Sequence, residues 1–406
     1  MAATVSTTGI QNGAADQLGS KSANGKHMVA YVKTKVKTAD RITLFLAGDI
    51  MTGRGIDQIL PHPSDPEIYE SYMRSAYGYV ELAEKTNGFI PKPVDFSYIW
   101  GDALAVLADV KPDLRIINLE TSVTKTDDYR PKGINYRMNP ENIACLSAAR
   151  IDGCILANNH VLDWTHAGLL ETLQNLEQAG IKSAGAGKNQ AQAEAPATFS
   201  IPGKGRLLVF AYGAKSSGIP ADWAAAEDLP GVNVLKYLSF HTVQKIKNLV
   251  AVNKQPGDFV LLSIHWGDNW GYEIPSYQKY FARKLLDDAG VDAIYGHSSH
   301  HVKGIEVYKD KLILYGCGDF LNDYEGIEGY EQFRDDLTLM YFPSFDPSSG
   351  KLVRMKMMPM QIKRFQTIHT TPEDSQWLVD ILNREGKRFG TRVEQREDGS
   401  LELLWQ

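Results

Sequence analysis

The sequence is poor in cysteine and contains no long apolar run. Cys145, Cys154 and Cys317 are its only cysteines among 406 residues, an odd number without paired or CxxC spacing. We therefore expect neither a disulfide framework nor a CxxC-type metal or redox site. No stretch reaches the roughly 18 consecutive apolar residues of a transmembrane helix, so we expect no integral membrane segment.

Basic residues are outnumbered as well. The chain has 43 Lys and Arg against 49 Asp and Glu, for a formal net charge of -6. A nucleic-acid-binding surface is normally built on a basic excess, so no nucleic-acid partner is expected. A hydrophobic content of 43% and a charged content of 23% are typical of a globular protein.

Residues 1–40 lack the apolar core of a signal peptide. They are rich in Gly, Ser, Thr, Ala and Asn with several Lys, a composition that predicts a disordered leader. Together with the unpaired cysteines, this favours a cytoplasmic location.

What the sequence does contain is a histidine-rich stretch, Asp292–His301. His297, His300 and His301 follow a short apolar run there. The pattern is typical of a strand that ends in a loop presenting metal ligands. Solvated loop histidines are the alternative.

Four other apolar runs stop at polar residues in the same way. They end at Asp49, at Glu120, at Asn158–His160 and at His265. Continuous apolar runs are typical of strands buried on both faces, and polar groups at the carboxyl ends of such strands converge in α/β proteins. The sequence therefore predicts an α/β fold with one site at these strand ends.

The motifs GD, NLE, NNH, HWG and GHxxH occur in this order at residues 48–49, 118–120, 158–160, 265–267 and 296–300. Between Arg41 and Phe342 the chain resembles the CapA family of capsule, or poly-γ-glutamate, biosynthesis proteins, within the calcineurin-like metallophosphoesterase superfamily. The resemblance implies a metallophosphoesterase-like sandwich of two mixed β-sheets flanked by helices. We assign it to residues 41–365, and residues 366–406 to a small appendage with a helix and a hairpin.

The resemblance also implies a set of metal ligands, which are Asp49, Glu120, Asn159, His265, His297 and His300. Mixed nitrogen and oxygen ligands favour one or two Mn, Fe or Zn ions. One residue departs from the superfamily pattern, because Met51 stands where a ligand histidine is usual. Asp49 has a second interpretation as a helix cap.

The candidate catalytic residues are His160, Asp163 and Arg54. By resemblance His160 is the general acid, and a histidine can deliver a proton at neutral pH. Asp163 could orient His160 or cap the next helix, and Arg54 could meet an anionic group of the substrate.

Three further residues, Asn118, Arg137 and His301, are predicted substrate contacts. Arg137 belongs to a polar loop with Arg130 and Lys132, which is equally typical of an ordinary solvated loop. Asp319 stands where the family more often has Asn, which indicates a further acid near the site.

These assignments predict a CapA-like, metal-dependent hydrolase that uses a metal-activated water. A small molecule or a γ-glutamyl polymer is the expected substrate, and a polymer synthase the expected partner. Two alternatives remain open: a phosphoesterase acting on a small phosphorylated substrate, and a non-catalytic accessory subunit of a polymer synthase.

Overall fold

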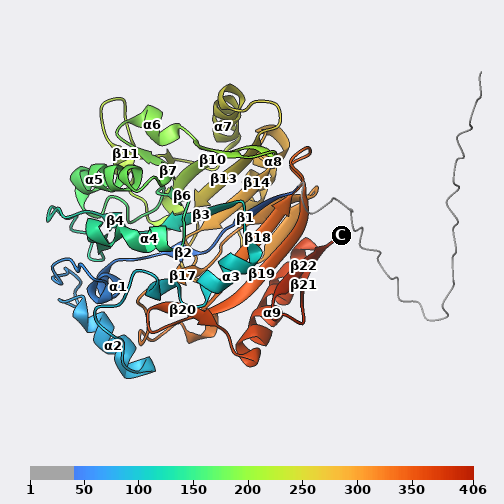
Figure 1. Ribbon diagram of the computed structural model, residues 1–406. Helices are drawn as coiled ribbons and strands as arrows, with labels where there is room; N and C mark the ends of the chain where they lie inside the picture. The colour runs from blue at the N-terminus through green and yellow to red at the C-terminus, as the bar shows by residue number, and fades with distance from the viewer. Residues whose placement is uncertain (1–40) are drawn as a thin grey trace, which may run out of the picture.

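Two β-sheets pack against each other and are flanked by helices in the computed structural model (Figure 1). The structure describes residues 41–406, so the predicted leader at residues 1–40 lies outside the described residues. The predicted fold, two mixed sheets with helices around them, is confirmed.

The first sheet has eleven strands in the order β17-β2-β3-β1-β18-β19-β22-β21, with β6 and β7 beyond β3 and β20 beside β19. Strands β2, β3, β6 and β7 are parallel, whereas β1, β18 and β19 pair antiparallel. The bounds are β1 Ile42–Phe45, β2 Asp49–Ile50, β3 Leu114–Leu119, β6 Gly153–Ile155, β7 Lys182–Ala184, β17 Asp319–Leu321, β18 Leu337–Phe345, β19 Leu352–Lys363, β20 Gln366–His369, β21 Thr391–Gln395 and β22 Leu401–Trp405.

The second sheet has seven strands in the order β12-β10-β13-β14-β16-β15, with β9 beside β10. Their bounds are β9 Ala197–Ile201, β10 Gly205–Ala214, β12 Val234–Leu235, β13 Phe259–His265, β14 Ala293–His297, β15 Ile305–Tyr308 and β16 Lys311–Leu314. Two small ribbons complete the strands: β4 Ser122–Val123 with β5 Arg137–Met138, and β8 Ala186–Gly187 with β11 Gly231–Val232.

The helices are mostly short. They are α1 Arg54–Ile59, α2 Tyr77–Asn87, α3 Ala103–Val110, α4 Ala144–Ala148, α5 Thr165–Gln178, α6 Gln190–Glu194, α7 Phe240–Asn253, α8 Ser276–Asp288 and α9 Pro372–Gly386. Single 3-10 turns lie at Tyr98–Trp100, Pro140–Ile143, Lys215–Ser217, Ala221–Trp223, Glu331–Phe333 and Lys387–Phe389. Within residues 41–406, every helix is too short or too polar to cross a membrane.

Strand β10 shows why the apolar runs of the sequence are continuous. Leu207 and Val209 point into the core shared by the two sheets, whereas Leu208 and Phe210 point into a second core formed with α7 and α8. Both faces of the strand are buried, so both sets of alternating residues are apolar. Burying one such side chain contributes about 1.5–3 kcal/mol.

The C-terminal segment contains the expected helix and hairpin, as α9 and as β21 with β22. Strand β22 also pairs with β19, where Lys356 lies opposite Glu402, so the hairpin extends the first sheet. The division of residues 366–406 into a separate appendage stays a prediction.

Tyr295 of β14 ties the two sheets together close to the end of β1. Its hydroxyl accepts a hydrogen bond from the backbone N–H of Ala47 at 3.1 Å and donates one to the Ala47 carbonyl at 2.5 Å. Because Tyr295 is fully buried and Ala47 lies two residues before Asp49, this contact fixes the second sheet relative to the strand end that carries Asp49.

Candidate metal centre and substrate cavity

The predicted strand ends meet where the two sheets face each other. In the first sheet Asp49 lies opposite Asn118 and Asn118 lies opposite Ile155, all in parallel register. In the second sheet His265 lies opposite His297, also in parallel register. Parallel strands bring their carboxyl ends to one edge, so the polar residues after them gather at one place.

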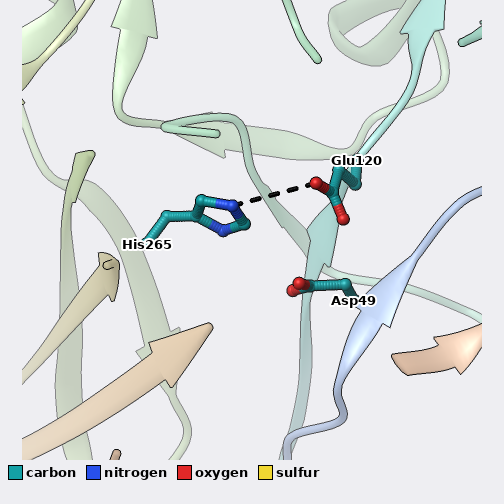
Figure 2. A group of neighbouring side chains, drawn as sticks. All are labelled: Asp49, Glu120 and His265. Carbon is teal, nitrogen blue, oxygen red and sulfur yellow. Dashed lines mark ion pairs between the residues drawn. The ribbon is translucent and has the colours of Figure 1, made fainter. Parts of the chain in front are cut away.

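Asp49, Glu120 and His265 form a buried cluster that could hold a metal ion. Their candidate ligand atoms all lie within 4.8 Å of one another. Figure 2 shows the three side chains pointing toward one another, with Glu120 Oε1 3.8 Å from His265 Nε2. Two of these residues come from the first sheet and one from the second, so the cluster bridges the sheets.

His297 completes this cluster on the side of Asp49. Its Nδ1 lies 3.0 Å from Asp49 Oδ1, but the ring is not aligned for a hydrogen bond. Both ring nitrogens of His297, and Nδ1 of His265, are buried without a hydrogen-bond partner among the described residues. Buried polar atoms are nearly always bonded, so these orphaned nitrogens beside two carboxylates fit a divalent cation.

Burial sets the protonation preferences within the cluster. It raises the pKa of Glu120, and the nearby charges of Asp49 and Asp319 raise it further. Burial alone would raise the pKa of Asp49 as well, but the adjacent His297 and His265 lower it more. Burial also lowers the pKa of His265 to about 3, which keeps its imidazole in the neutral form that binds metals.

Asn159 and His160 reach the same cluster from the loop after β6. The side-chain oxygen of Asn159 lies 3.0 Å from His265 Nε2, and His160 Nε2 lies 3.9 Å from Glu120 Oε1. The loop is held to the first sheet because the Asn158 side-chain amide donates to the carbonyl of Leu119 at 2.9 Å.

His160 is oriented by a carboxylate and by an aromatic ring. Its Nδ1 lies 2.6 Å from Asp163 Oδ2, and its ring stacks on Tyr136 with the centroids 3.8 Å apart. Burial lowers the pKa of His160 to about 4 and outweighs the opposing effect of Asp163. With Nδ1 donating to Asp163, Nε2 is left to accept a proton on the side of Glu120.

Lys132, which the sequence prediction did not include in the site, completes the surroundings of Asp163. Its ammonium lies 2.6 Å from Asp163 Oδ1 and 2.5 Å from the carbonyl of Asn159. Together with Tyr136 it joins the polar loop to His160. The clustering of Arg and Lys in that loop was the only sequence signal for this role.

His300 pairs with Asp319 instead of with the three-residue cluster. Its Nδ1 lies 3.0 Å from Asp319, and its Nε2 lies 2.9 Å from the side-chain amide of Asn269. Asp319 itself lies opposite Asp49 in the parallel pairing of β17 with β2. The acid that replaces the more usual Asn is therefore a direct neighbour of Asp49.

Two predicted substrate contacts lie away from the cavity beside this cluster. Arg137 donates to Asp127 at 2.8 Å and to the Thr126 carbonyl at 2.9 Å. His301 is fully buried, 4.7 Å from the ring of Phe333. Asn118 is also buried and donates to Asp49 at 2.8 Å, which gives it a supporting position beneath the cluster.

Arg54 lines the cavity, but its guanidinium is already paired. Its Nη1 donates to Glu70 at 2.8 Å, and its Nε and Nη2 both donate to Asp323. The guanidinium also lies 4.8 Å from the centre of the Tyr136 ring. Arg54 therefore supports the Tyr136 ring that stacks on His160, and each of its guanidinium nitrogens already donates to a carboxylate of the chain.

A cavity of about 610 Å³ opens over the cluster. Its floor includes Glu120, Asn159, His160, His265 and His300. Its walls combine cations with aromatic and apolar side chains, which include Arg130, Pro131, Lys132, Ile134, Pro220, Trp223, Trp270, Tyr324, Ile327 and Tyr330. A concave pocket with few convergent polar groups is the usual form of a ligand site.

Comparison with known proteins agrees with this architecture. Residues 43–324 match the family model described as bacterial capsule synthesis protein PGA_cap. The chain is 45% identical over 367 residues to a Mycobacterium tuberculosis protein named "Probable polyglutamine synthesis accessory protein", which covers 90% of this chain and 96% of that relative.

More distant relatives carry the CapA name. The chain is 23% identical to the capsule biosynthesis protein CapA of Bacillus anthracis, over 77% of this chain and 66% of that relative. It is 24% identical to the PGA biosynthesis protein CapA of Bacillus subtilis, over 76% and 70% respectively. The chain therefore belongs to the bacterial capsule synthesis protein family, as its motif order predicts.

Proposed function

We propose that this protein is a metal-dependent hydrolase that acts on a γ-glutamyl polymer or a fragment of one. The observation that carries the proposal is the buried cluster of Asp49, Glu120 and His265, with the orphaned nitrogens of His297 beside it. Glu120 and His265 of this cluster line a cavity. Buried nitrogens without a hydrogen-bond partner are costly, and a divalent ion beside the two carboxylates would complete them. The γ-glutamyl substrate comes from the resemblance to the CapA family, and the names of the family and of one relative refer to capsule synthesis and PGA biosynthesis.

Asp49, Glu120, His265 and His297 would hold the ion, with Asn159 beside His265 as a further ligand. His300 would join them only by leaving Asp319 or Asn269. One or two Mn, Fe or Zn ions suit this mixture of carboxylate, amide and imidazole groups. A bound divalent ion would lower the pKa of a water molecule and would polarise the scissile group.

The residues of the chain itself would position the substrate and handle its proton. Asp163 and the Tyr136 ring hold His160 so that Nε2 faces the cavity floor. Because an anionic substrate near the ring would raise the pKa of His160, substrate binding favours a proton on Nε2 that can pass to the leaving group. The aromatic walls would limit the access of bulk water.

A phosphoesterase and a non-catalytic accessory subunit are the two alternatives to this hydrolase. A phosphoesterase would use the same cluster, although Met51 occupies a position where that superfamily usually has a ligand histidine. An accessory subunit of a polymer synthase, the role in the name of the Mycobacterium tuberculosis relative, would need neither turnover nor metal. A synthase partner and a cytoplasmic location are part of the proposal.

The first experiment is elemental analysis of the purified protein, together with hydrolysis of γ-glutamyl peptides and of p-nitrophenyl phosphates. His297→Ala should lose both the metal and the turnover of one panel. His241→Ala, a change on the exposed face of α7, is the matched control and should keep both. Absence of bound metal after loading with Mn, Fe and Zn would refute the hydrolase proposal and favour the accessory role.

A further inference from the structure

The three cations that line the cavity differ in how completely they are paired. Arg54 uses three nitrogens on two buried carboxylates. Lys132 is bound by Asp163 and by the Asn159 carbonyl. Both side chains are thereby bound within the protein, whereas the third cation, Arg130, has a single long side-chain contact.

Arg130 is held only weakly by its side-chain contacts. Within residues 41–406, the guanidinium makes one hydrogen bond, from Nη1 to Asp222 Oδ2 at 3.4 Å. This distance lies at the outer limit for a hydrogen bond, and the Asp222 side chain is 70% exposed. An exposed, stretched ion pair of this kind contributes little and is easily replaced.

The Nε of Arg130 is buried and has no hydrogen-bond partner among the residues that the structure describes. A guanidinium has five donors arranged as a planar fork that matches the two oxygens of a carboxylate. One weak contact leaves most of that fork free. Since buried donors are seldom left unpaired, the arrangement indicates that a group of a bound ligand pairs with the free donors of Arg130.

The backbone beneath Arg130 is firmly anchored, unlike its side chain. Its N–H donates to the Asp163 carbonyl at 2.8 Å, and its own carbonyl accepts from the Asn135 amide at 3.0 Å. Asp163 also orients His160. The position of Arg130 is therefore fixed relative to the group that we propose to transfer a proton.

The cavity wall beside Arg130 is largely apolar. Pro131, Pro220 and Trp223 line it, and Trp223 is buried at 2% exposure. Such a wall suits methylene groups, while the guanidinium suits an anion at their end. A carboxylate carried on a short aliphatic chain satisfies both parts of the wall.

We infer that Arg130 is the specificity-determining residue of the cavity. Its guanidinium leaves Asp222 and binds a carboxylate of the substrate instead. The inference deepens the proposed function, on which it rests for the location of the substrate. It replaces Arg137 with Arg130 as the cation of this loop that meets substrate, because Arg137 is bonded to Asp127 and Thr126 outside the cavity.

Calorimetric binding of γ-L-glutamyl-L-glutamate tests the inference without requiring turnover. Arg130→Ala should weaken binding of this peptide at least about tenfold, and Arg130→Lys should recover only part of the loss because it lacks the fork. The same peptide with its carboxyl groups amidated should bind the parent and Arg130→Ala equally. Asp222→Asn should strengthen peptide binding, since the competing carboxylate is gone.

Controls separate this inference from a folding defect and from failure of the proposed function. Arg137→Gln should bind the peptide like the parent, and circular dichroism should be unchanged in each variant. Binding that depends on Arg130 in a protein without metal or turnover would support the carboxylate site while refuting the hydrolase.

Two outcomes would overturn the inference. One is parental affinity of Arg130→Ala for the peptide, or an equal loss for the amidated peptide. The other is tighter binding of inorganic phosphate than of the peptide to the parent, with that binding lost in Arg130→Ala, because it would make the ligand group a phosphate.

Discussion

Two buried clusters of charged side chains lie close together in this protein, and they differ in one respect. Around Arg54, every guanidinium nitrogen donates to Glu70 or Asp323, so each nitrogen has a carboxylate partner within the chain. Around Glu120, carboxylates face one another and imidazole nitrogens lack partners. The first cluster is complete in hydrogen bonds within the chain, whereas the second is incomplete and could hold a cation.

The extent of hydrogen bonding within each cluster separates a structural role from a ligand-binding role. Buried charges are tolerated when they are paired and hydrogen-bonded. A cluster that violates this rule while lining a cavity is where an external ion or substrate is expected. Removing one charged side chain should therefore change the free energy of unfolding in opposite directions in the two clusters.

The largest effect is expected at the complete cluster. Arg54→Met leaves Glu70 and Asp323 buried without a counter-charge, and such a break costs about 3–5 kcal/mol of unfolding free energy. Urea unfolding in the presence of EDTA measures it. Lys92→Met, which removes a partly exposed pair with Glu84, is the matched control and should cost less than about 1 kcal/mol. A similar small loss for both variants would show that the Arg54 cluster has no special stability.

The opposite response is expected at the incomplete cluster. Burial and the charges of Asp49 and Asp319 raise the pKa of Glu120, so its charge is unfavourable when no ion is present. Glu120→Gln should therefore leave the stability in EDTA unchanged or higher.

The same variant should respond differently when metal is added. Saturating Mn²⁺ at a hundredfold excess over its Kd should stabilise the parent by about 2.7 kcal/mol. Glu120→Gln should lose this gain because its Mn²⁺ affinity falls at least about a hundredfold, as titration calorimetry would measure. Equal stabilisation of parent and variant would contradict a metal role for Glu120.

A buried cation that forms no ion pair within residues 41–406 provides a further comparison. Lys303 is 7% exposed, and burial lowers its pKa to about 8 from 10.5. Between these two values the unfolded chain holds more protons, so the free energy of unfolding gains a contribution that rises with pH.

Lys303→Met removes this dependence. The variant should be more stable than the parent by about 3 kcal/mol at a pH of roughly 7, and the difference should shrink toward a pH of roughly 10. Urea unfolding of both proteins across that range is the measurement. A constant difference would mean that Lys303 keeps its ordinary pKa in the folded protein.

The sequence could predict the strands and their polar ends because each depends on local pattern. The runs that precede Asp49, Glu120 and His265 are continuous and apolar since both faces of those strands are buried. Their convergence follows from parallel pairing. The family resemblance then supplied the two-sheet arrangement that brings His265 to Glu120.

Pairings over long distances could not be predicted in this way. Arg54 finds Asp323 across 269 residues, and nothing near Arg54 in the sequence indicates that its charge is already neutralised. Arg130 and Arg137 are alike in composition and lie in one loop, but the loop turns one toward the cavity and the other toward Asp127. Only the folded chain distinguishes them.

The position of the cluster between the sheets has a mechanical consequence. Asp49 and Glu120 lie at strand ends of one sheet, and His265 and His297 lie at strand ends of the other. The hydrogen bonds of Tyr295 to Ala47 already link the two sheets a few residues away. An ion shared by these four residues would add a second link between the two sheets. Metal binding would then slow amide hydrogen exchange in β2 and β13 together, because the two sheets would open as one cooperative unit.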